Sequence, residues 1–138
     1  MSSVSWDQRV NYKFFSDRYI IFEKNGKGKE YDKFKGKLIF EGEYLKGIRN
    51  GKGKEYNKDG ELIFEGEYLN GERNGKGKEY LNGEISFEGE YLNGKRNGKG
   101  KEYYDNGKLL FEGEYLNREI HGKGKEWRTR NKNLSIRR

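Results

Sequence analysis

The sequence predicts an all-β protein of tandem β-hairpins, forming an elongated, single, twisted antiparallel sheet that stays open at both ends. Three observations predict this class. Two short phrases recur at nearly constant spacing, glycine alternates with charged residues inside them, and the chain contains no proline. A repeat period in the range of about 20 to 50 residues is typical of arrays in which each unit contacts only its neighbours.

The composition fits a thin structure with little interior. Hydrophobic residues make up 30% of the chain and charged residues 38%, against about 45–50% and about 25% in an average globular domain. These two values alone would indicate disorder, because little apolar surface is available to offset chain entropy. Aromatic residues nevertheless reach 15% and follow a fixed pattern, which favours an ordered array.

The repeats are defined by the two phrases. Phe-Glu-Gly-Glu-Tyr-Leu begins at Phe40, Phe64, Phe87 and Phe111, and Gly-Lys-Gly-Lys-Glu begins at Gly26, Gly51, Gly75, Gly98 and Gly122. The second phrase follows the first by eleven residues, so counting back from Gly26 makes Phe15 the start of a degraded copy. The predicted organisation is a cap segment (1–14), five repeats (15–31, 40–56, 64–80, 87–103 and 111–127, within 15–127) and a C-terminal tail (128–138).

Within a repeat, alternation with period two predicts two strands joined by a loop over residues 45–50. If Gly42 lies opposite Gly53, three further pairs follow in the antiparallel register. These pairs are Tyr44 with Gly51, Glu41 with Lys54, and Glu43 with Lys52. Opposite charges that face each other across strands stabilise a hairpin. Turn-forming residues at 57–60, 81–83 and 105–107 are expected to join one hairpin to the next.

The glycines are expected to leave a floor on which aromatic rings lie, with a Glu/Lys ladder on the opposite face. Strict alternation places Glu55 on the aromatic face and Tyr56 on the other, and a bulge or the end of pairing near Glu55 would change this. An exposed aromatic groove would be an apolar patch of the kind that marks interaction sites. The candidate groove residues are Phe40, Tyr44, Phe64, Tyr68, Phe87, Tyr91, Phe111 and Tyr115.

The stretch from Phe87 to Gly100, Phe-Glu-Gly-Glu-Tyr-Leu-Asn-Gly-Lys-Arg-Asn-Gly-Lys-Gly, resembles the MORN (membrane occupation and recognition nexus) motif. The resemblance covers about residues 15–127, with a period slightly longer than is usual in the family. It implies elongated β arrays that act as scaffolds. Members bind helical or extended protein segments, associate end to end and, in some cases, bind phospholipids.

The residues offer no catalytic constellation. Gly-Lys-Gly-Lys differs from a phosphate-binding loop, which needs Gly-Lys followed by Ser or Thr at the start of a helix. The single histidine, His121, occupies a position held by asparagine in the other repeats, and there is no cysteine. Glu41 and Glu43 recur in every clean repeat opposite lysines, which is typical of a charge-paired sheet face. We therefore expect no enzyme activity, no cofactor and no metal.

The net charge of +7 belongs mainly to the tail. Five of these charges lie in the last eleven residues, on Arg128, Arg130, Lys132, Arg137 and Arg138. Such a tail is able to contact an anionic phospholipid surface, whereas the nearly balanced repeats do not favour a nucleic-acid partner.

The leading hypothesis is a non-catalytic scaffold that presents its groove to a protein segment or to a second copy of itself. The alternative is a peripheral module on anionic membrane that uses the tail and the lysine ladder. A third hypothesis is a recently duplicated or designed repeat without an evolved ligand. No stretch reaches the ~20 apolar residues of a membrane-spanning helix, and we expect a cytoplasmic protein, including one peripheral to a membrane or the cytoskeleton. The hypothesis that the chain's own ends cover the groove stays open, with Trp6, Val10 and Tyr12 at one end and Leu134 and Ile136 at the other.

Overall fold

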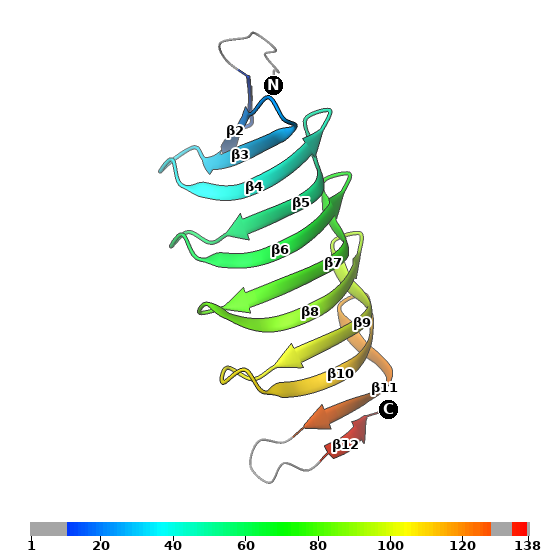
Figure 1. Ribbon diagram of the computed structural model, residues 1–138. Helices are drawn as coiled ribbons and strands as arrows, with labels where there is room; N and C mark the ends of the chain where they lie inside the picture. Colours follow the sequence, from blue (N-terminus) through cyan, green and yellow to red (C-terminus); the bar gives the residue numbers. More distant parts are fainter. Residues whose placement is uncertain (1–10, 128–133, 138) are drawn as a thin grey trace. The chain divides into compact units, whose positions relative to one another are not determined.

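A computed structural model describes residues 11–127 and 134–137, and it divides into two compact units, Met1–Gly71 and Glu72–Arg138. The strands of the first unit are β1 (Tyr12–Phe14), β2 (Arg18–Phe22), β3 (Lys27–Asp32), β4 (Leu38–Leu45), β5 (Ile48–Tyr56) and β6 (Leu62–Leu69). Those of the second are β7 (Glu72–Leu81), β8 (Glu84–Leu92), β9 (Lys95–Tyr103), β10 (Leu109–Leu116), β11 (Glu119–Trp127) and β12 (Leu134–Arg137). The strands can be followed in Figure 1.

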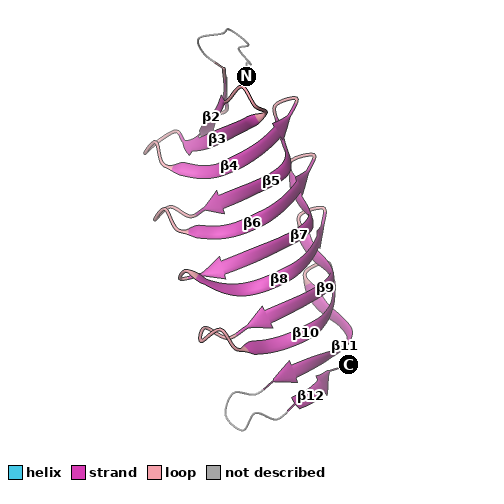
Figure 2. Cartoon of the chain, in the orientation of Figure 1, coloured by secondary structure: helices cyan, strands magenta, loops and turns pink. Residues whose placement is uncertain are grey.

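The predicted fold class is confirmed. Within each unit, strands that are consecutive in the sequence are antiparallel neighbours in the sheet. The described residues contain strands and turns but no helix (Figure 2). This hairpin order needs no crossover, because each short turn brings the next strand directly beside the last.

Two kinds of turn join the strands. In the first kind, which joins the two strands of one hairpin, both turn residues have positive φ. An example is Lys46 (φ 52°) with Gly47 (φ 79°) between β4 and β5. Such turns match the twist of the flanking strands and favour Asn-Gly. The predicted loop over 45–50 is therefore wrong, since Leu45 and Ile48 already belong to strands. The predicted turns at 57–60 and 105–107 are confirmed, and the one at 81–83 is confirmed for residues 82–83, since Leu81 ends β7.

The predicted register is half right. Gly42 lies opposite Gly53 and Glu41 opposite Lys54, but a bulge follows and places Tyr44 opposite Arg49. The predicted pair of Tyr44 with Gly51 and that of Glu43 with Lys52 are therefore wrong. Without the bulge, Gly47 and Ile48 would form the turn, and a β-branched residue does not tolerate positive φ. The bulge moves the turn to residues 46–47.

The predicted kind of pairing occurs instead between successive hairpins. Lys52 lies opposite Glu67 and Gly51 opposite Tyr68 where β5 meets β6. Within its own hairpin, the Glu43 carboxylate accepts a hydrogen bond from the Lys52 backbone N–H at 2.7 Å. Charge pairing therefore also joins one repeat to the next. The alternation of residues alone does not distinguish such pairs from pairs inside a repeat.

The first repeat differs from the predicted copy. Ile20, not Phe15, lies opposite Glu30, and Phe22 lies opposite Gly28. Phe15 lies in the turn before β2, where its N–H donates to the Arg18 carbonyl at 2.8 Å. The count of eleven residues failed because the strands of this hairpin are shorter. The position opposite Glu30 is Ile20, ten residues earlier, whereas the position opposite Glu55 is Phe40, fifteen residues earlier. The end of the predicted cap segment is itself the strand β1, which pairs with β2.

Candidate functional site

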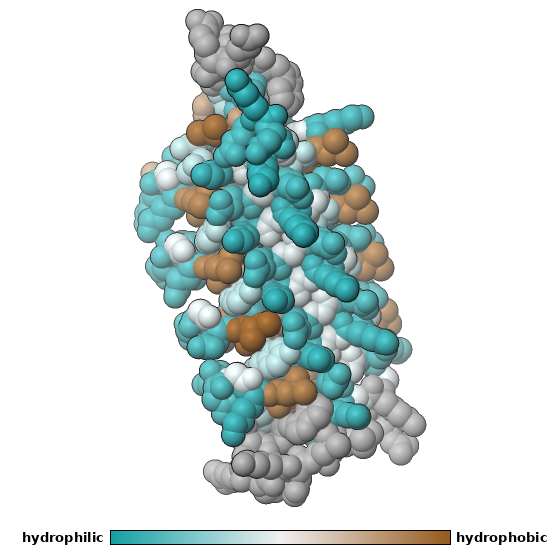
Figure 3. All heavy atoms as spheres, in the orientation of Figure 1, coloured by the Kyte–Doolittle hydropathy of each residue, from teal (hydrophilic) through white to brown (hydrophobic). Residues whose placement is uncertain are grey.

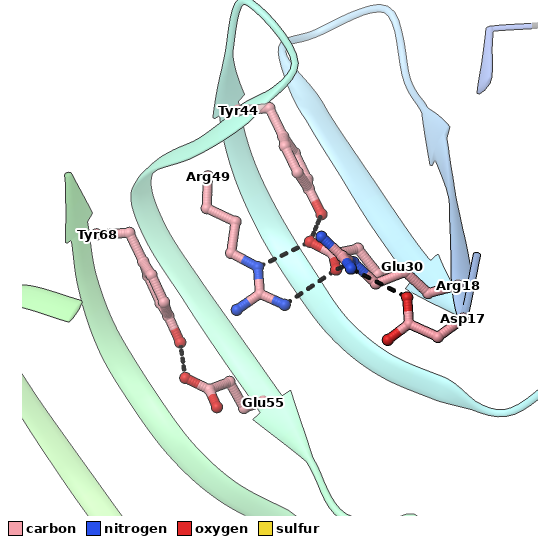
Figure 4. Close-up of polar contacts among 7 residues, drawn as sticks. All are labelled: Asp17, Arg18, Glu30, Tyr44, Arg49, Glu55 and Tyr68. Carbon is pink, nitrogen blue, oxygen red and sulfur yellow. Dashed lines mark hydrogen bonds and ion pairs between the residues drawn. The ribbon is translucent and has the colours of Figure 1, made fainter. Parts of the chain in front are cut away.

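The aromatic face of the first unit is centred on the carboxylate of Glu30, drawn in Figure 4. Arg49 reaches it from β5 and donates from Nε at 2.7 Å and from Nη2 at 2.9 Å. The Tyr44 hydroxyl donates to the same carboxylate at 2.7 Å, and Arg18 Nε at 3.2 Å. Glu30 keeps only 2% of its surface exposed. A carboxylate buried this deeply is stable because charged and neutral donors satisfy both of its oxygens.

The second unit repeats the arrangement on Glu79. Arg96 donates to it from Nε and from Nη2, both at 2.9 Å, and the Tyr91 hydroxyl donates to Oε2. In each unit the arginine belongs to the strand that follows the tyrosine across a tight turn, while the glutamate belongs to the preceding hairpin. The cluster therefore fastens successive repeats together.

Each arginine also covers a phenylalanine. The Arg49 guanidinium carbon lies 4.0 Å from the centroid of the Phe40 ring, and Arg96 lies 4.0 Å from that of Phe87. A cation over an aromatic face is attracted by the ring quadrupole. The side chains thus stack in layers: glycine backbone, phenylalanine ring, then the arginine–glutamate pair.

The glycine floor is confirmed by what a side chain would meet there. A Cβ added at Gly53 would overlap the Phe40 ring, with 2.6 Å to Cε1 and less to Cζ, and would lie 3.1 Å from the Tyr68 ring. These rings meet edge to face, with centroids 5.1 Å apart, a favourable geometry for aromatic pairs. Glycine is needed at this position because the ring takes the space of a side chain.

The prediction of an exposed aromatic groove is wrong. Seven of the eight candidate residues are buried, and Tyr44 is half-buried. The buried ones are Phe40, Phe64, Tyr68, Phe87, Tyr91, Phe111 and Tyr115. Bending of the strands, the glycine floor and the covering arginines enclose the rings without a second layer of structure. The surface of this face is therefore formed by polar groups.

Electrostatics keep the carboxylates of both clusters charged near neutral pH. Burial alone would raise the pKa of Glu30, but the hydrogen bonds and charge of Arg49, with the Tyr44 hydroxyl, hold it below its ordinary value. Glu79 has a lowered pKa for the same reasons, with Arg96 and Tyr91 as its partners. Burial and the neighbouring carboxylates raise the pKa values of Tyr44 and Tyr91. No member of the two clusters is thereby moved toward neutrality, where a general acid or base works best.

The opposite face carries the Glu/Lys ladder. Glu41 lies opposite Lys54 in its hairpin and accepts a hydrogen bond from the Tyr56 hydroxyl. Burial and this carboxylate raise the pKa of Tyr56 to about 12. Alternation had placed Tyr56 on this face and Glu55 on the other, and both placements are confirmed, since Glu55 accepts from Tyr68. The bulge lies just after Glu55 and does not return it to the ladder.

The exposed apolar side chains lie near the strand ends. They are chiefly leucines that follow the buried tyrosines and residues at turns: Leu45, Ile48, Leu69, Leu81, Leu92 and Leu116. Figure 3 shows charged side chains over the middle of the strands and apolar ones nearer the ends. The apolar surface is consequently divided into small pieces, unlike the continuous groove that the sequence predicted.

Four of the five candidate tail residues lie outside the described residues, namely Arg128, Arg130, Lys132 and Arg138. Arg137 belongs to β12, where its backbone pairs with that of Gly124. The tail predicted for 128–138 therefore includes a strand. Trp6 and Val10, suggested as covers for the groove, also fall outside the described part, whereas Tyr12 pairs with Ile21 in β1 and β2.

The arginines and their glutamates are the residues that sequence reasoning missed. Arg49, Arg73 and Arg96 recur at a fixed place after the tight turn, and this recurrence was available as a signal. Their partners could not be read from alternation, because they lie in the preceding repeat. His121 is exposed and lies opposite Glu114. Among the described residues, no group of His, Cys, Asp and Glu is arranged to hold a metal ion.

The chain is a β-repeat array. Its tandem hairpins share a glycine floor, and arginine–glutamate pairs connect successive hairpins. The MORN repeat family model matches residues 40–61, 64–83, 87–108 and 111–131, together more than half of the chain. The chain therefore belongs to the MORN repeat family. The first hairpin lies outside these matches, in agreement with its different register.

Comparison with curated proteins gives no match. Among solved structures, the crystal structure of TarM matches 86% of this chain with 9% identity and a TM-score of 0.33. This chain covers 18% of the length of that one. In the described part of the chain, no helix has the length and apolar character needed to span a membrane.

Proposed function

We propose that the chain is a non-catalytic interaction scaffold that receives a partner segment, or a second copy of itself, on the face of the arginine–glutamate clusters. MORN repeat proteins are generally non-catalytic, and this chain is a β-repeat array of that family. The proposal rests on one observation: the arginine of each described cluster keeps part of its side chain exposed and one guanidinium nitrogen without a hydrogen bond to the described residues.

The nitrogen that each cluster leaves without a hydrogen bond is Nη1 of the arginine. Arg49 and Arg96 use Nε and Nη2 on their glutamates, and Nη1 of each makes no hydrogen bond to the described residues. Both side chains remain partly exposed, at 24% and 22%. The carboxylate and the ring beneath hold each guanidinium in place, so that binding would cost little additional side-chain ordering.

The spacing of the repeats suits an extended or helical segment. Within the second unit, the arginine positions 73 and 96 lie on β7 and β9, and two strand spacings amount to about 10 Å. Three residues of an extended segment, or two turns of an α-helix, advance by about the same distance. A segment that crosses the strands of this unit would therefore present one carbonyl or carboxylate group to each of these two positions.

Affinity capture with paired variants tests the proposal. In the test variant, Arg49→Lys plus Arg96→Lys keeps the positive charge but removes the planar donors. In the control, Lys52→Gln plus Lys99→Gln changes the ladder face. Loss of the captured partner, or of a dimer seen by light scattering, in the test variant alone would support the proposal. Loss in the control alone would contradict it.

A second candidate function is favoured by the loop between β3 and β4. Phe34 at its tip is 82% exposed and is flanked by Lys33 and Lys35. Asp32 holds the loop by accepting hydrogen bonds from the backbone N–H groups of Phe34 and Lys35 at 3.1 and 2.9 Å. An exposed aromatic ring among lysines suits the interface of an anionic membrane.

Flotation with phosphatidylserine vesicles tests this second function. Phe34→Ser should reduce binding at every salt concentration, whereas replacing Lys33 and Lys35 by glutamine should remove mainly its salt-sensitive part. Binding that instead requires the cationic residues of 128–138 would assign the contact to the tail. The absence of flotation at low salt would remove the membrane hypothesis.

A further inference from the structure

The last hairpin lacks the arginine that the preceding repeats share. The sequence places arginine five residues after the tyrosine in three repeats, at 49, 73 and 96, but isoleucine at 120. The backbone register is the same in both cases, because Tyr91 lies opposite Arg96 and Tyr115 opposite Ile120. Ile120 therefore stands where an arginine would otherwise reach back to the preceding repeat.

The carboxylate that this arginine would bind is Glu102. It lies on β9, and its Oε2 accepts a hydrogen bond from the Tyr115 hydroxyl, as Glu79 Oε2 does from Tyr91. The Oε1 atom of Glu102 makes no hydrogen bond or ion pair to any described residue, whereas Oε1 of Glu79 receives Arg96 Nη2 at 2.9 Å. Glu102 is half-buried, and Ile120, at the register position of Arg96, has no donor to offer it.

The charge of Arg96 acts on Glu102, but no described cation donates a hydrogen bond to this carboxylate. A half-buried carboxylate without a charged donor is poorly stabilised, because burial removes water without replacing its hydrogen bonds. The fold already shows which group satisfies such a carboxylate here. Arg96 fills the equivalent place at Glu79 with two charge-assisted hydrogen bonds and lies over a phenylalanine ring. A planar guanidinium suits this geometry better than the point charge of a lysine.

We propose that Glu102, Tyr115 and Ile120 form an open arginine site, which accepts the guanidinium group of an arginine side chain on a partner protein segment. The inference deepens the scaffold function, on which it rests, by naming one feature of the partner. The other repeats supply this arginine from their own strand, whereas the last hairpin receives it from outside. Charge and shape complementarity to Glu102 select the occupant.

Filling the site from within is the first test. Ile120→Arg should raise the Tm by about 3 °C, since it restores a charge-assisted pair, and Glu102→Gln should abolish that gain when both are present. Ile120→Lys is the matched control and should gain less. A gain for Ile120→Arg that persists with Glu102→Gln, or no gain at all, would overturn the proposal.

Binding of a small probe is the second test, and it needs no natural partner. The probe is a blocked Gly-Arg-Gly peptide, and its control carries citrulline, which has the same shape without the charge. Only the arginine peptide should shift the amide NMR signals of Tyr115 and Ile120 in the full chain. Ile120→Arg should block this shift, and Arg96→Ile should create a second responding site at Tyr91.

Each outcome of these tests either supports or overturns the arginine site. Equal shifts with the citrulline peptide, or no shifts at Tyr115 and Ile120, would overturn the arginine site. Binding only after Arg128, Arg130 and Lys132 are replaced by alanine would assign the site to the chain's own residues and also overturn it. A positive probe result combined with failure of the affinity capture would support the site and count against the scaffold function, which keeps the two separable.

Discussion

The hairpin β2–β3 and the hairpin β8–β9 place a carboxylate on the same face, but they support it differently. In β8–β9, Phe87 lies over Gly89 and Gly100. In β2–β3, the corresponding positions hold Ile20, Phe22 and Gly28, so that the ring comes from a different strand position. Phe22 packs edge to face on Tyr44 of the next hairpin, with centroids 5.3 Å apart.

The two hairpins also bind carboxylates that are held differently. Glu30 lies on β3 itself and receives two arginines and one tyrosine. Glu79 lies on β7, outside β8–β9, and receives Arg96 and Tyr91 from that hairpin. Glu30 is almost fully buried, and Glu79 keeps 24% of its side chain exposed. The first hairpin has no preceding repeat in the regular register, and it uses an additional arginine of its own, Arg18, in the deeper site.

Substitutions in the glycine floor should give the largest difference in stability between the two hairpins. A Cβ at Gly89 would lie 2.5 Å from the Lys99 carbonyl oxygen and 2.7 Å from the Gly100 Cα, which cannot move aside. Gly89→Ala should therefore lower the free energy of unfolding by about 3 kcal/mol. Urea unfolding followed by circular dichroism measures the loss.

Gly28→Ala is its counterpart in the first hairpin. The added Cβ would meet the Tyr44 ring at 2.9 Å and the Ile21 carbonyl oxygen at 3.1 Å, and Tyr44 is only half-buried. The expected loss is about 1 kcal/mol. Equal losses at both positions would contradict the idea that the floor distinguishes the regular hairpins from the first one.

Removing the arginines that bind Glu79 and Glu30 should give the next largest change in the free energy of unfolding. Arg96→Met removes both charge-assisted hydrogen bonds to Glu79 and uncovers Phe87, which should cost about 2 kcal/mol. Arg18→Met removes one longer hydrogen bond from Glu30, which keeps Arg49, together with an exposed contact to Asp17 and one to the Phe15 ring, and should cost less than about 1 kcal/mol. Thermal unfolding of the two variants tests this order, and a larger loss for Arg18→Met would contradict it.

Acid should weaken both clusters. The pKa values of Glu30 and Glu79 are lower in the folded chain than their ordinary values. Each group therefore contributes stability that is complete above its unfolded pKa of about 4.3 and is lost as the pH falls through the folded pKa. Urea unfolding between pH 6 and pH 3 should show falling stability, with a shallower decline in Glu79→Gln. An unchanged slope in that variant would count against the role of the Glu79 carboxylate.

These contrasts mark how far the sequence could predict the structure. The fold class and the pair of Gly42 with Gly53 followed from local alternation, which depends only on strand geometry. The bulge after Gly42 did not, because it depends on the demand of the turn at 46–47 for positive φ. The pair of Arg49 with Glu30 joins residues of different repeats, and burial of Phe40 depends on sheet curvature. Neither is encoded in the pattern of a single repeat.

A substitution in the turn of the last hairpin should give the smallest change in the free energy of unfolding. Unlike the others, this change should be an increase. Arg118 has φ 81° at the place where Gly94 has φ 85° in β8–β9. A side chain in this region carries strain of about 1 kcal/mol, which glycine avoids. Arg118→Gly should therefore raise the free energy of unfolding by about that amount, and its N–H is able to keep the hydrogen bond to the Arg96 carbonyl. Gly94→Arg should produce a similar loss. If Arg118→Gly were destabilising, the arginine would have to contribute contacts that outweigh the strain, and the last turn would then differ from the regular ones in more than its backbone.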